Sequence, residues 1–310
     1  MHVGLATSTP LVDCEELYAH ALSALQASFQ REGNALVAFD RIDEDAASHS
    51  RQRSARKLLD DRELGTAFQP IWDLEGDRPL GFEATARPSA DYALSGAELH
   101  DVAEAIGRTS ELDELSWRWA LTRAEELTGD IALFLPASNS TGQDDASVER
   151  LRTLVANSSR TPEQVVLVFT EKSSETRELL SGQTARLRAA GFKIALDNVG
   201  AHGSDPDIVE AVFAEYVILD ASIVKDAPTD AVARGMLSTI CGLAGKRGSH
   251  VIAAGVDNET VLRFLREELP TWATGTVRGA QGTLLGRPAD GKPVLRPAPY
   301  PPMPREKTQA

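Results

Sequence analysis

Short apolar runs alternate with helical stretches through the second half of the chain, and this alternation limits the folds open to it. Each run is nearly continuous in apolar residues, as in parallel strands that are covered on both faces. Strands are expected at 131–138, 164–171, 193–200, 216–224 and 250–257, with helices between them at 148–156, 174–190, 206–213, 230–246 and 259–269. Alternating units of this length predict an α/β fold, a TIM-like (β/α) barrel, whose functional side chains lie at the C-terminal ends of the strands.

A β-hairpin is expected ahead of these units, at residues 68–88. Its sequence, FQPIWDLEGDRPLGFEATARP, has two apolar runs around a turn, with the polar residues Gln69 and Glu83 inside the runs. Glu83, Thr85 and Arg87 are spaced two residues apart, so a strand directs all three side chains to one face. A carboxylate and a guanidinium on one buried strand indicate a phosphate or metal site, with an ion pair at a strand end as the alternative.

The two halves of this hairpin, FQPI and GFEATARP, resemble the opening of an EAL domain, with Glu83-Ala84-Thr85 in the place of its Glu-Ala-Leu signature. Active members of that family hydrolyse cyclic di-GMP on a barrel of mostly parallel strands. They use two metal ions, Mg or Mn, to clamp a phosphodiester and activate water. Such hard cations require oxygen ligands, several of them carboxylates. The resemblance covers residues 55–288 with the family's motifs in order, and it implies an EAL-type barrel.

Several residues of the family's site are retained. Glu83 matches the signature glutamate, which the resemblance implies as a metal ligand, and Asp197 matches the first aspartate of the DDFG motif. Gln69, Arg87 and Gln281 match positions near the nucleotide, which completes a possible ligand-binding set of five residues. Taken singly, Asp197 fits a turn cap, the glutamines fit satisfied core amides, and Glu83 with Arg87 fits an ion pair. Their joint match to one family favours a vestigial pocket.

Five positions of the same site have lost their functional group. By the resemblance, Pro136 replaces the asparagine of an NLS-like motif, Val168 a metal-binding glutamate, and Asn198 the second aspartate of DDFG. Ile218 replaces a lysine near the attacking water, and Ala254 replaces the glutamate of an EGVE motif. These changes predict a pseudo-phosphodiesterase with no catalytic residue and no metal cofactor.

The chain around the barrel divides into further segments. Residues 1–42 fit a strand, a helix and a strand, similar to the C-terminal end of a GGDEF domain without its signature loop. They are either a remnant docked on the barrel or the end of a longer protein. Residues 43–54 are polar and are expected as a linker, residues 55–289 as the degenerate EAL domain, and residues 290–310 as a proline-rich disordered tail.

The formal net charge of −14 argues against nucleic acid as a partner, because an acidic surface repels polyanions. No apolar run approaches the ~20 residues of a membrane span, and the first residues lack the pattern of a signal peptide. Two distant cysteines, Cys14 and Cys241, without a CxxC spacing argue against a disulfide framework or a zinc site. These features together predict a cytoplasmic location with no membrane partner.

Three functions stay open from the sequence. The first is a catalytically inactive regulatory module of cyclic di-GMP signalling that acts through a protein partner. The second is a receptor that binds cyclic di-GMP without cleaving it, and the third is an active phosphodiesterase with an altered metal site. The resemblance also implies a possible homodimer through residues 201–212, and the segment 272–279 predicts a reshaped rim before Gln281.

Overall fold

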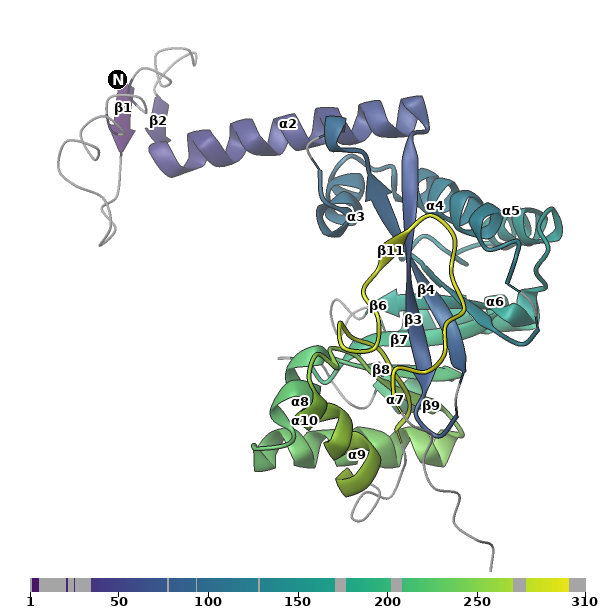
Figure 1. Ribbon diagram of the computed structural model, residues 1–310. Helices are drawn as coiled ribbons and strands as arrows, with labels where there is room; N and C mark the ends of the chain where they lie inside the picture. Colours follow the sequence, from purple (N-terminus) through teal and green to yellow (C-terminus); the bar gives the residue numbers. More distant parts are fainter. Residues whose placement is uncertain are drawn as a thin grey trace, which may run out of the picture. The chain divides into compact units, whose positions relative to one another are not determined.

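The structure is a computed structural model that describes residues 2–5, 21, 25, 35–76, 78–92, 94–127, 129–170, 177–201, 208–269 and 277–300. By their contacts the residues form two compact units, one of residues 1–61 and 90–107 and one of residues 62–89 and 108–310. The larger unit contains the strands that form a barrel (Figure 1).

The smaller unit begins with two short strands. β1 (His2–Leu5) and β2 (Ala35–Ala38) pair in parallel, and both fall within the strands expected for residues 1–42. The helix expected between them lies outside the described residues, except for Ala21 and Leu25, which are helical. The similarity of this segment to a GGDEF domain stays a prediction.

A long helix, α2 (Phe39–Asp61), follows β2 directly. The polar segment 43–54, which was expected as a linker, lies within this helix. Residues 39–61 contain neither glycine nor proline, so no residue in the segment opposes a continuous helix. Polarity alone therefore does not indicate whether such a segment is irregular or helical.

Two further elements complete the smaller unit. A 3-10 helix, η1 (Ala90–Tyr92), is held by the Tyr92 hydroxyl, which donates to a carboxylate oxygen of Asp61 over 3.0 Å. The helix α3 (Gly96–Ala105) begins at a capping box, in which Ser95 Oγ accepts from the Glu98 N–H and the Glu98 carboxylate accepts from the Ser95 N–H. This reciprocal pair satisfies two backbone donors at the helix start.

The larger unit is a closed barrel of eight strands, β3 to β10, arranged in sequence order. β3 runs antiparallel to both of its neighbours, β4 and β10, and its pairing with β10 closes the barrel, whereas the other neighbours are parallel. The strands are β3 (Leu64–Asp73), β4 (Pro79–Pro88), β5 (Ala132–Pro136), β6 (Val165–Thr170), β7 (Lys193–Val199), β8 (Tyr216–Leu219), β9 (His250–Ala253) and β10 (Val277–Ala280). The predicted α/β fold and TIM-like barrel are confirmed.

Helices fill the connections between these strands. They are α4 (Thr109–Arg123), α5 (Asp145–Ala156), η2 (Pro162–Gln164), α6 (Arg177–Ala189), α7 (Ile208–Ala211), α8 (Ala221–Asp226), α9 (Ala231–Arg247), α10 (Glu259–Arg263) and the π-helical turn η4 (Phe264–Glu268). Across the described ranges, every helix is too short or too polar to cross a membrane.

The strand expected at 216–224 is wrong in its second half. β8 ends at Leu219, because Asp220 caps α8 by accepting hydrogen bonds from the N–H and the hydroxyl of Ser222. A local cap thus overrides the apolar run that follows it in the sequence.

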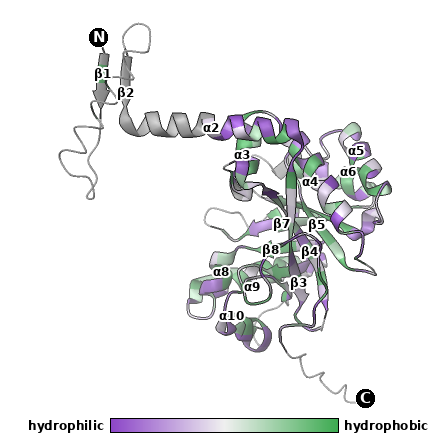
Figure 2. Ribbon diagram, turned by 45° about the horizontal axis from the view of Figure 1, so that its top comes forward, coloured by the Kyte–Doolittle hydropathy of each residue, from purple (hydrophilic) through white to green (hydrophobic). Residues whose placement is uncertain are grey.

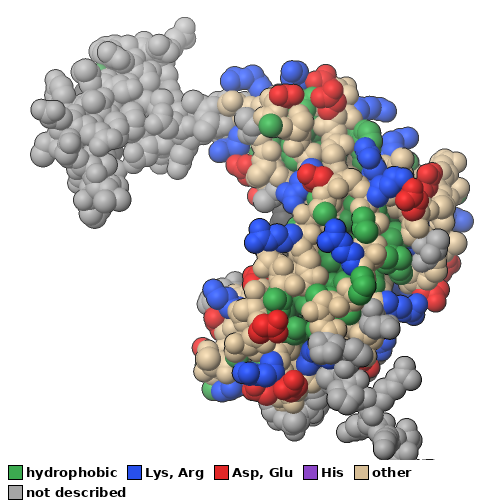
Figure 3. Space-filling view, in the orientation of Figure 1, with side chains coloured by type: hydrophobic (Ala, Val, Ile, Leu, Met, Phe, Trp, Pro, Cys, Tyr) green, Lys and Arg blue, Asp and Glu red, His purple; other side chains and the backbone are tan. Residues whose placement is uncertain are grey.

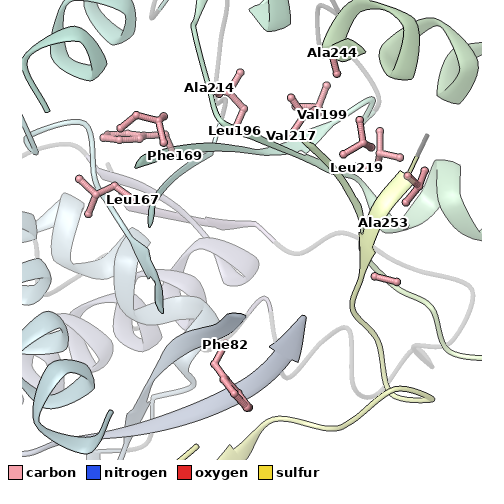
Figure 4. Packing of buried hydrophobic residues seen from close by; sticks show 14 of the residues in the cluster. Phe82, Leu167, Phe169, Leu196, Val199, Ala214, Val217, Leu219, Ala244 and Ala253 are labelled. Carbon is pink, nitrogen blue, oxygen red and sulfur yellow. The ribbon is translucent and has the colours of Figure 1, made fainter. Parts of the chain in front are cut away.

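Hydrophobic side chains pack on both faces of the barrel wall, since residues along each strand alternate between the faces. The inner cluster includes Ile71, Phe134, Val168, Ile218 and Ile252. The outer residues pack with the helices, and Figure 4 shows some of them, among them Phe82, Leu167, Phe169, Leu196 and Val217. In Figure 2 the barrel strands are largely hydrophobic, while the helices around them mix both kinds of residue.

The C-terminal segment packs against the barrel as far as Tyr300, which corrects the disordered tail for residues 290–300 of the range expected at 290–310. β11 (Ala289–Asp290) pairs antiparallel with β3, and the yellow segment crosses in front of β3 and β4 in Figure 1. Residues 301–310 lie outside the described residues.

Tyr300 anchors this segment. Its hydroxyl donates to the carbonyl of Asp73 over 2.7 Å, and its ring meets Trp72 edge-on with centroids 6.3 Å apart. The guanidinium of Arg266 lies 4.7 Å from the ring centroid. Tyr300 therefore holds the proline-rich segment in place. Because prolines restrict the unfolded chain, ordering this segment costs little conformational entropy.

We expect Tyr300→Phe to lower the free energy of unfolding by about 1 kcal/mol, since it removes one buried hydrogen bond and keeps the ring. Urea denaturation followed by circular dichroism measures the change. Thr239→Val, which alters an exposed hydroxyl on α9, is the control and should leave the midpoint nearly unchanged. Equal midpoints for Tyr300→Phe and the wild type would show that the hydrogen bond to Asp73 adds nothing to stability.

Candidate functional site

Three of the predicted site residues form one hydrogen-bonded group at the mouth of the barrel. Gln69 on β3 and Glu83 on β4 are paired in the strand register, and Gln281 follows β10 directly. Nε2 of Gln281 donates to Oε1 of Gln69 over 3.0 Å and to the carboxylate of Glu83. Nε2 of Gln69 donates to the carbonyl of Gly286 over 2.9 Å. Both amides are therefore satisfied within the chain, while the group still lies where the site was predicted.

Glu83 is a carboxyl group that folding makes harder to ionise. Its pKa is raised to about 7, mainly because the group is buried. The hydrogen bond from Gln281 lowers the pKa, and the negative charge of Asp197 raises it. The sensitivity to Asp197 shows that the two retained carboxylates act on one another electrostatically. Near neutral pH the site therefore holds a mixture of the acid and the carboxylate form of Glu83.

Asp197 lies near the end of β7, opposite Thr170 of β6 in the register. Burial raises its pKa; hydrogen bonds from the Asn198 N–H and from Thr170 lower it, and the charge of Asp220 raises it. Asn198 has a φ of 59°, a left-handed conformation that asparagine tolerates better than most residues. Its side chain is exposed. At the end of β7 the Asp197 side chain is therefore largely withdrawn from solvent, whereas the Asn198 side chain beside it is exposed.

The positions that lack a functional group are largely filled by packed apolar side chains. Val168 and Ile218 are each only 5% exposed and belong to the inner cluster of the barrel, against which Ala254 also packs. Pro136 is half-buried, and its carbonyl accepts a hydrogen bond of 2.8 Å from Nε1 of Trp117. The interior beneath the mouth is therefore built as hydrophobic core.

Arg87 does not pair with Glu83, which was the alternative interpretation of the hairpin. Its Nε lies 3.8 Å from a carboxylate oxygen of Asp290 on β11, and its side chain is 45% exposed. The sequence could not indicate this partner, because Asp290 is far from Arg87 in the sequence and comes close to it only when β11 pairs with β3. Arg87 lies four residues beyond Glu83 on β4, and none of the hydrogen bonds that join Gln69, Glu83 and Gln281 involves it.

Sequence reasoning missed the contacts that hold Gln281 in place. Its backbone N–H donates to the carbonyl of Ala253, and its carbonyl accepts from Val256. A Cβ at Gly282 would lie 2.2 Å from the carbonyl oxygen of Val256, so only glycine permits this approach. The Ala280-Gln281-Gly282 motif is therefore explained by close packing of the loops after β9 and β10.

Asp257 is a second residue that the sequence prediction did not use. Its carboxylate accepts from the N–H and the hydroxyl of Thr283, over 2.8 and 2.7 Å, and these bonds lower its pKa. The contact ties the loop after β9 to the loop that carries Gln281. Asp257 positions the site without belonging to it.

Two carboxylates of the predicted site, Glu83 and Asp197, lie at the mouth of the barrel. Over the residues that the structure describes, no three His, Cys, Asp or Glu side chains gather as an ion site. The two carboxylates, Glu83 and Asp197, both have raised pKa values, which disfavours the charged form that a cation binds. The loops 171–176, with Glu171, and 202–207 lie outside the described residues.

A family profile described as the EAL domain matches residues 52–281 of the chain. Among solved structures, the PaMucR phosphodiesterase in complex with c-di-GMP has a similar fold, with a TM-score of 0.66 and 21% identity over 77% of this chain and 96% of that one. The FimX EAL domain from Pseudomonas aeruginosa bound to c-di-GMP gives a TM-score of 0.66 and 18% identity over 77% of this chain and 96% of that one. These likenesses establish the fold.

Two curated relatives extend the comparison. An uncharacterised signalling protein of Caulobacter vibrioides is 26% identical over 296 residues, which are 89% of this chain and 34% of that protein. A cyclic di-GMP phosphodiesterase of Pseudomonas aeruginosa is 25% identical over 228 residues, 71% of this chain and 38% of that protein. The chain spans about a third of the length of these relatives.

Proposed function

The chain belongs to the EAL domain family, and we propose that it is a non-hydrolysing regulatory module of cyclic di-GMP signalling that acts through a protein partner. The family relationship rests on the match over residues 52–281. The loss of hydrolysis and the action through a partner are the two parts of the proposal. Each is supported by a different property of the barrel mouth.

The packing of Val168 and Ile218 carries the first part. By family resemblance these positions hold a metal-binding glutamate and a lysine near the attacking water, whereas here both side chains are buried in the inner apolar cluster. A hydrophobic side chain that packs with its neighbours supplies neither an oxygen ligand nor a proton donor. The two-metal reaction therefore lacks both the glutamate ligand and the lysine at these positions.

The charge of the mouth supports the second part. Without metal ions, the phosphates of cyclic di-GMP would approach Glu83 and Asp197 on a chain with a formal net charge of −14. At ~5 Å and an effective dielectric constant of ~20, each like-charge contact costs about 3 kcal/mol, as much as one arginine returns. We therefore place a protein partner ahead of the nucleotide as the binding target.

A cyclic di-GMP receptor that does not cleave its ligand is the second candidate. The observation that favours it is the weak pairing of Arg87. Its side chain is half-exposed, and its Nε lies 3.8 Å from the nearest carboxylate oxygen of Asp290. Such a long ion pair at the surface contributes little, so the guanidinium is available to bind a phosphate bidentately. Gln69 and Gln281 offer hydrogen-bonding amides at Glu83, four residues before Arg87 on β4.

Calorimetric titration with cyclic di-GMP at pH 8 separates the two candidates. We expect the wild type to bind more weakly than about 1 µM, and Glu83→Gln to bind more tightly because it removes one like charge. If the pocket binds, Arg87→Ala weakens the affinity about tenfold or more by removing a charge-assisted contact. Arg118→Ala, an exposed residue of α4, is the matched control.

Micromolar or tighter binding by the wild type would place the receptor ahead of the partner-binding module. Binding that Arg87→Ala leaves unchanged would locate the nucleotide elsewhere on the chain. Neither outcome depends on an activity assay, so the test of binding stays separate from the test of hydrolysis.

Homodimerisation through residues 201–212 stays a prediction. Residues 202–207 lie outside the described residues, and Ile208, Val209 and Val212 are buried in the chain's own core. A dimer contact in this region would therefore use the polar side of α7 rather than these apolar residues.

A further inference from the structure

Two arginines converge on one exposed aromatic ring, that of Phe213. Over the residues that the structure describes, Phe213 is the only Phe, Tyr or Trp with an exposed side chain, and 51% of it is accessible to solvent. The guanidinium carbon of Arg247 lies 4.5 Å from the ring centroid, and that of Arg188 lies 5.3 Å from it. We name these three residues the Phe213 cluster. Because both guanidinium groups contact the same ring, one ligand segment can reach both charges.

The Phe213 cluster lies at the end of the barrel opposite the candidate site. Arg188 is in the last turn of α6, which leads into β7, and Arg247 is in the last turn of α9, which leads into β9. Phe213 lies between α7 and the start of β8. In barrels of this kind the N-terminal ends of the strands serve stability rather than chemistry. A ring that is half-exposed contributes less to stability than a buried one, which points to another role for it.

Contacts with neutral groups hold both arginines in place. Nη2 of Arg247 donates to the carbonyl of Glu210 over 2.7 Å, and Nε of Arg188 donates to the carbonyl of Thr184 over 3.4 Å. The position of each arginine at a helix C-terminus is favourable for a cation. Within the described part of the chain, neither guanidinium forms an ion pair with a carboxylate, so each keeps N–H donors for a binding partner.

We propose that the Phe213 cluster binds an acidic segment of a protein partner, whose carboxylates pair with Arg188 and Arg247 and whose apolar side chain packs on Phe213. Arginine and aromatic residues supply much of the binding energy at protein interfaces. A guanidinium group suits a carboxylate, with which it can form two parallel hydrogen bonds. Because both arginines are already held against the ring, little side-chain entropy is lost when the partner binds.

The charge of the chain favours a protein segment over a long polyanion. Figure 3 shows Asp and Glu side chains among the Lys and Arg side chains of one face, and the formal net charge is −14. A nucleic acid or an anionic membrane would meet this acidic surface as well as the cluster, whereas a protein segment can place its carboxylates at the cluster alone. The inference rests on the partner-binding part of the proposed function.

Titration of the full chain with a short peptide of repeated Glu-Glu-Leu units, followed by fluorescence anisotropy, tests this inference. A peptide of Gln-Gln-Leu units is the matched control. We expect the acidic peptide to bind with a dissociation constant below about 1 mM, and the glutamine peptide to bind at least about fivefold more weakly. Arg247→Gln, Arg188→Gln and Phe213→Ala should each weaken the acidic peptide by about threefold or more. Arg152→Gln, which changes an exposed arginine of α5, should leave its affinity unchanged.

Three results would overturn the inference: no binding of the acidic peptide at millimolar concentration, equal affinity for the two peptides, or wild-type affinity in all three variants of the cluster. Tighter binding of inorganic tripolyphosphate, with the same dependence on Arg188 and Arg247, would also overturn it by assigning the cluster to a phosphate ligand. Circular dichroism of each variant checks that a loss of affinity is not a loss of fold. The titrations contain no cyclic di-GMP, so a negative result leaves the predicted loss of hydrolysis standing.

Discussion

Replacing Glu83 by glutamine should raise the free energy of unfolding by about 3 kcal/mol at pH 8, with the advantage shrinking towards pH 5. Burial raises the pKa of Glu83 from 4.5 to about 7. A carboxyl whose pKa is higher in the folded state holds its proton more tightly there. Its contribution to stability is complete below the unfolded pKa and is lost as the pH rises from about 4.5 to about 7. Glutamine carries no charge at any pH and avoids this loss.

Urea denaturation of the wild type and Glu83→Gln at several pH values between 5 and 8 measures the effect. The difference in unfolding free energy should widen with pH and level off above about pH 7, where folded Glu83 has ionised. Glu149→Gln, which changes an exposed carboxylate of α5, is the control for a general effect of charge. Parallel stability curves for the wild type and Glu83→Gln would mean that the carboxyl is not buried as described.

The second large effect is on catalysis: we expect no hydrolysis of cyclic di-GMP with Mg²⁺ or Mn²⁺. Two divalent ions need several carboxylates, and of the metal-site positions that the family resemblance identifies, Glu83 and Asp197 keep theirs, each with a raised pKa. Removing one member of a cooperating catalytic group already costs orders of magnitude in rate. Here Val168 and Ile218 stand where the family resemblance implies a metal-binding glutamate and a lysine, and both side chains pack in the inner hydrophobic cluster.

The hairpin and most of the barrel could be predicted from the sequence, because continuous apolar runs mark strands that are covered on both faces. β10 could not, since its residues, Val277–Ala280, are short and include an arginine and a glycine. What makes them a strand is pairing with β9 and β3, which closes the barrel. Closure of the barrel depends on the whole sheet, so the sequence of one segment does not indicate it.

Three of the residues that the family resemblance assigned to the site come together in the structure, and the strand pairing explains why. Gln69 and Glu83 face one another because the hairpin pairs them, and Gln281 joins them because β10 neighbours β3. The partner of Arg87 was missed, because Asp290 comes from a segment some 200 residues away in sequence. Contacts that depend on distant segments cannot be inferred from local spacing.

The C-terminal segment shows a different limit. Its prolines favoured a disordered tail, but Tyr300 supplies a buried hydroxyl and ring that hold it on the hairpin. One anchoring residue outweighs the composition of its neighbours, and its effect appears only when the surface that receives it is known.

Incubation of equimolar protein and cyclic di-GMP with Mg²⁺ or Mn²⁺, followed by chromatography, tests the central claim most directly. An active EAL phosphodiesterase run in parallel shows that the conditions support hydrolysis. The account predicts that cyclic di-GMP is recovered intact with this chain and that no linear pGpG forms. Linear pGpG that appears with the wild type and disappears with Glu83→Ala would contradict it, because the retained carboxylate would then be part of a working metal site.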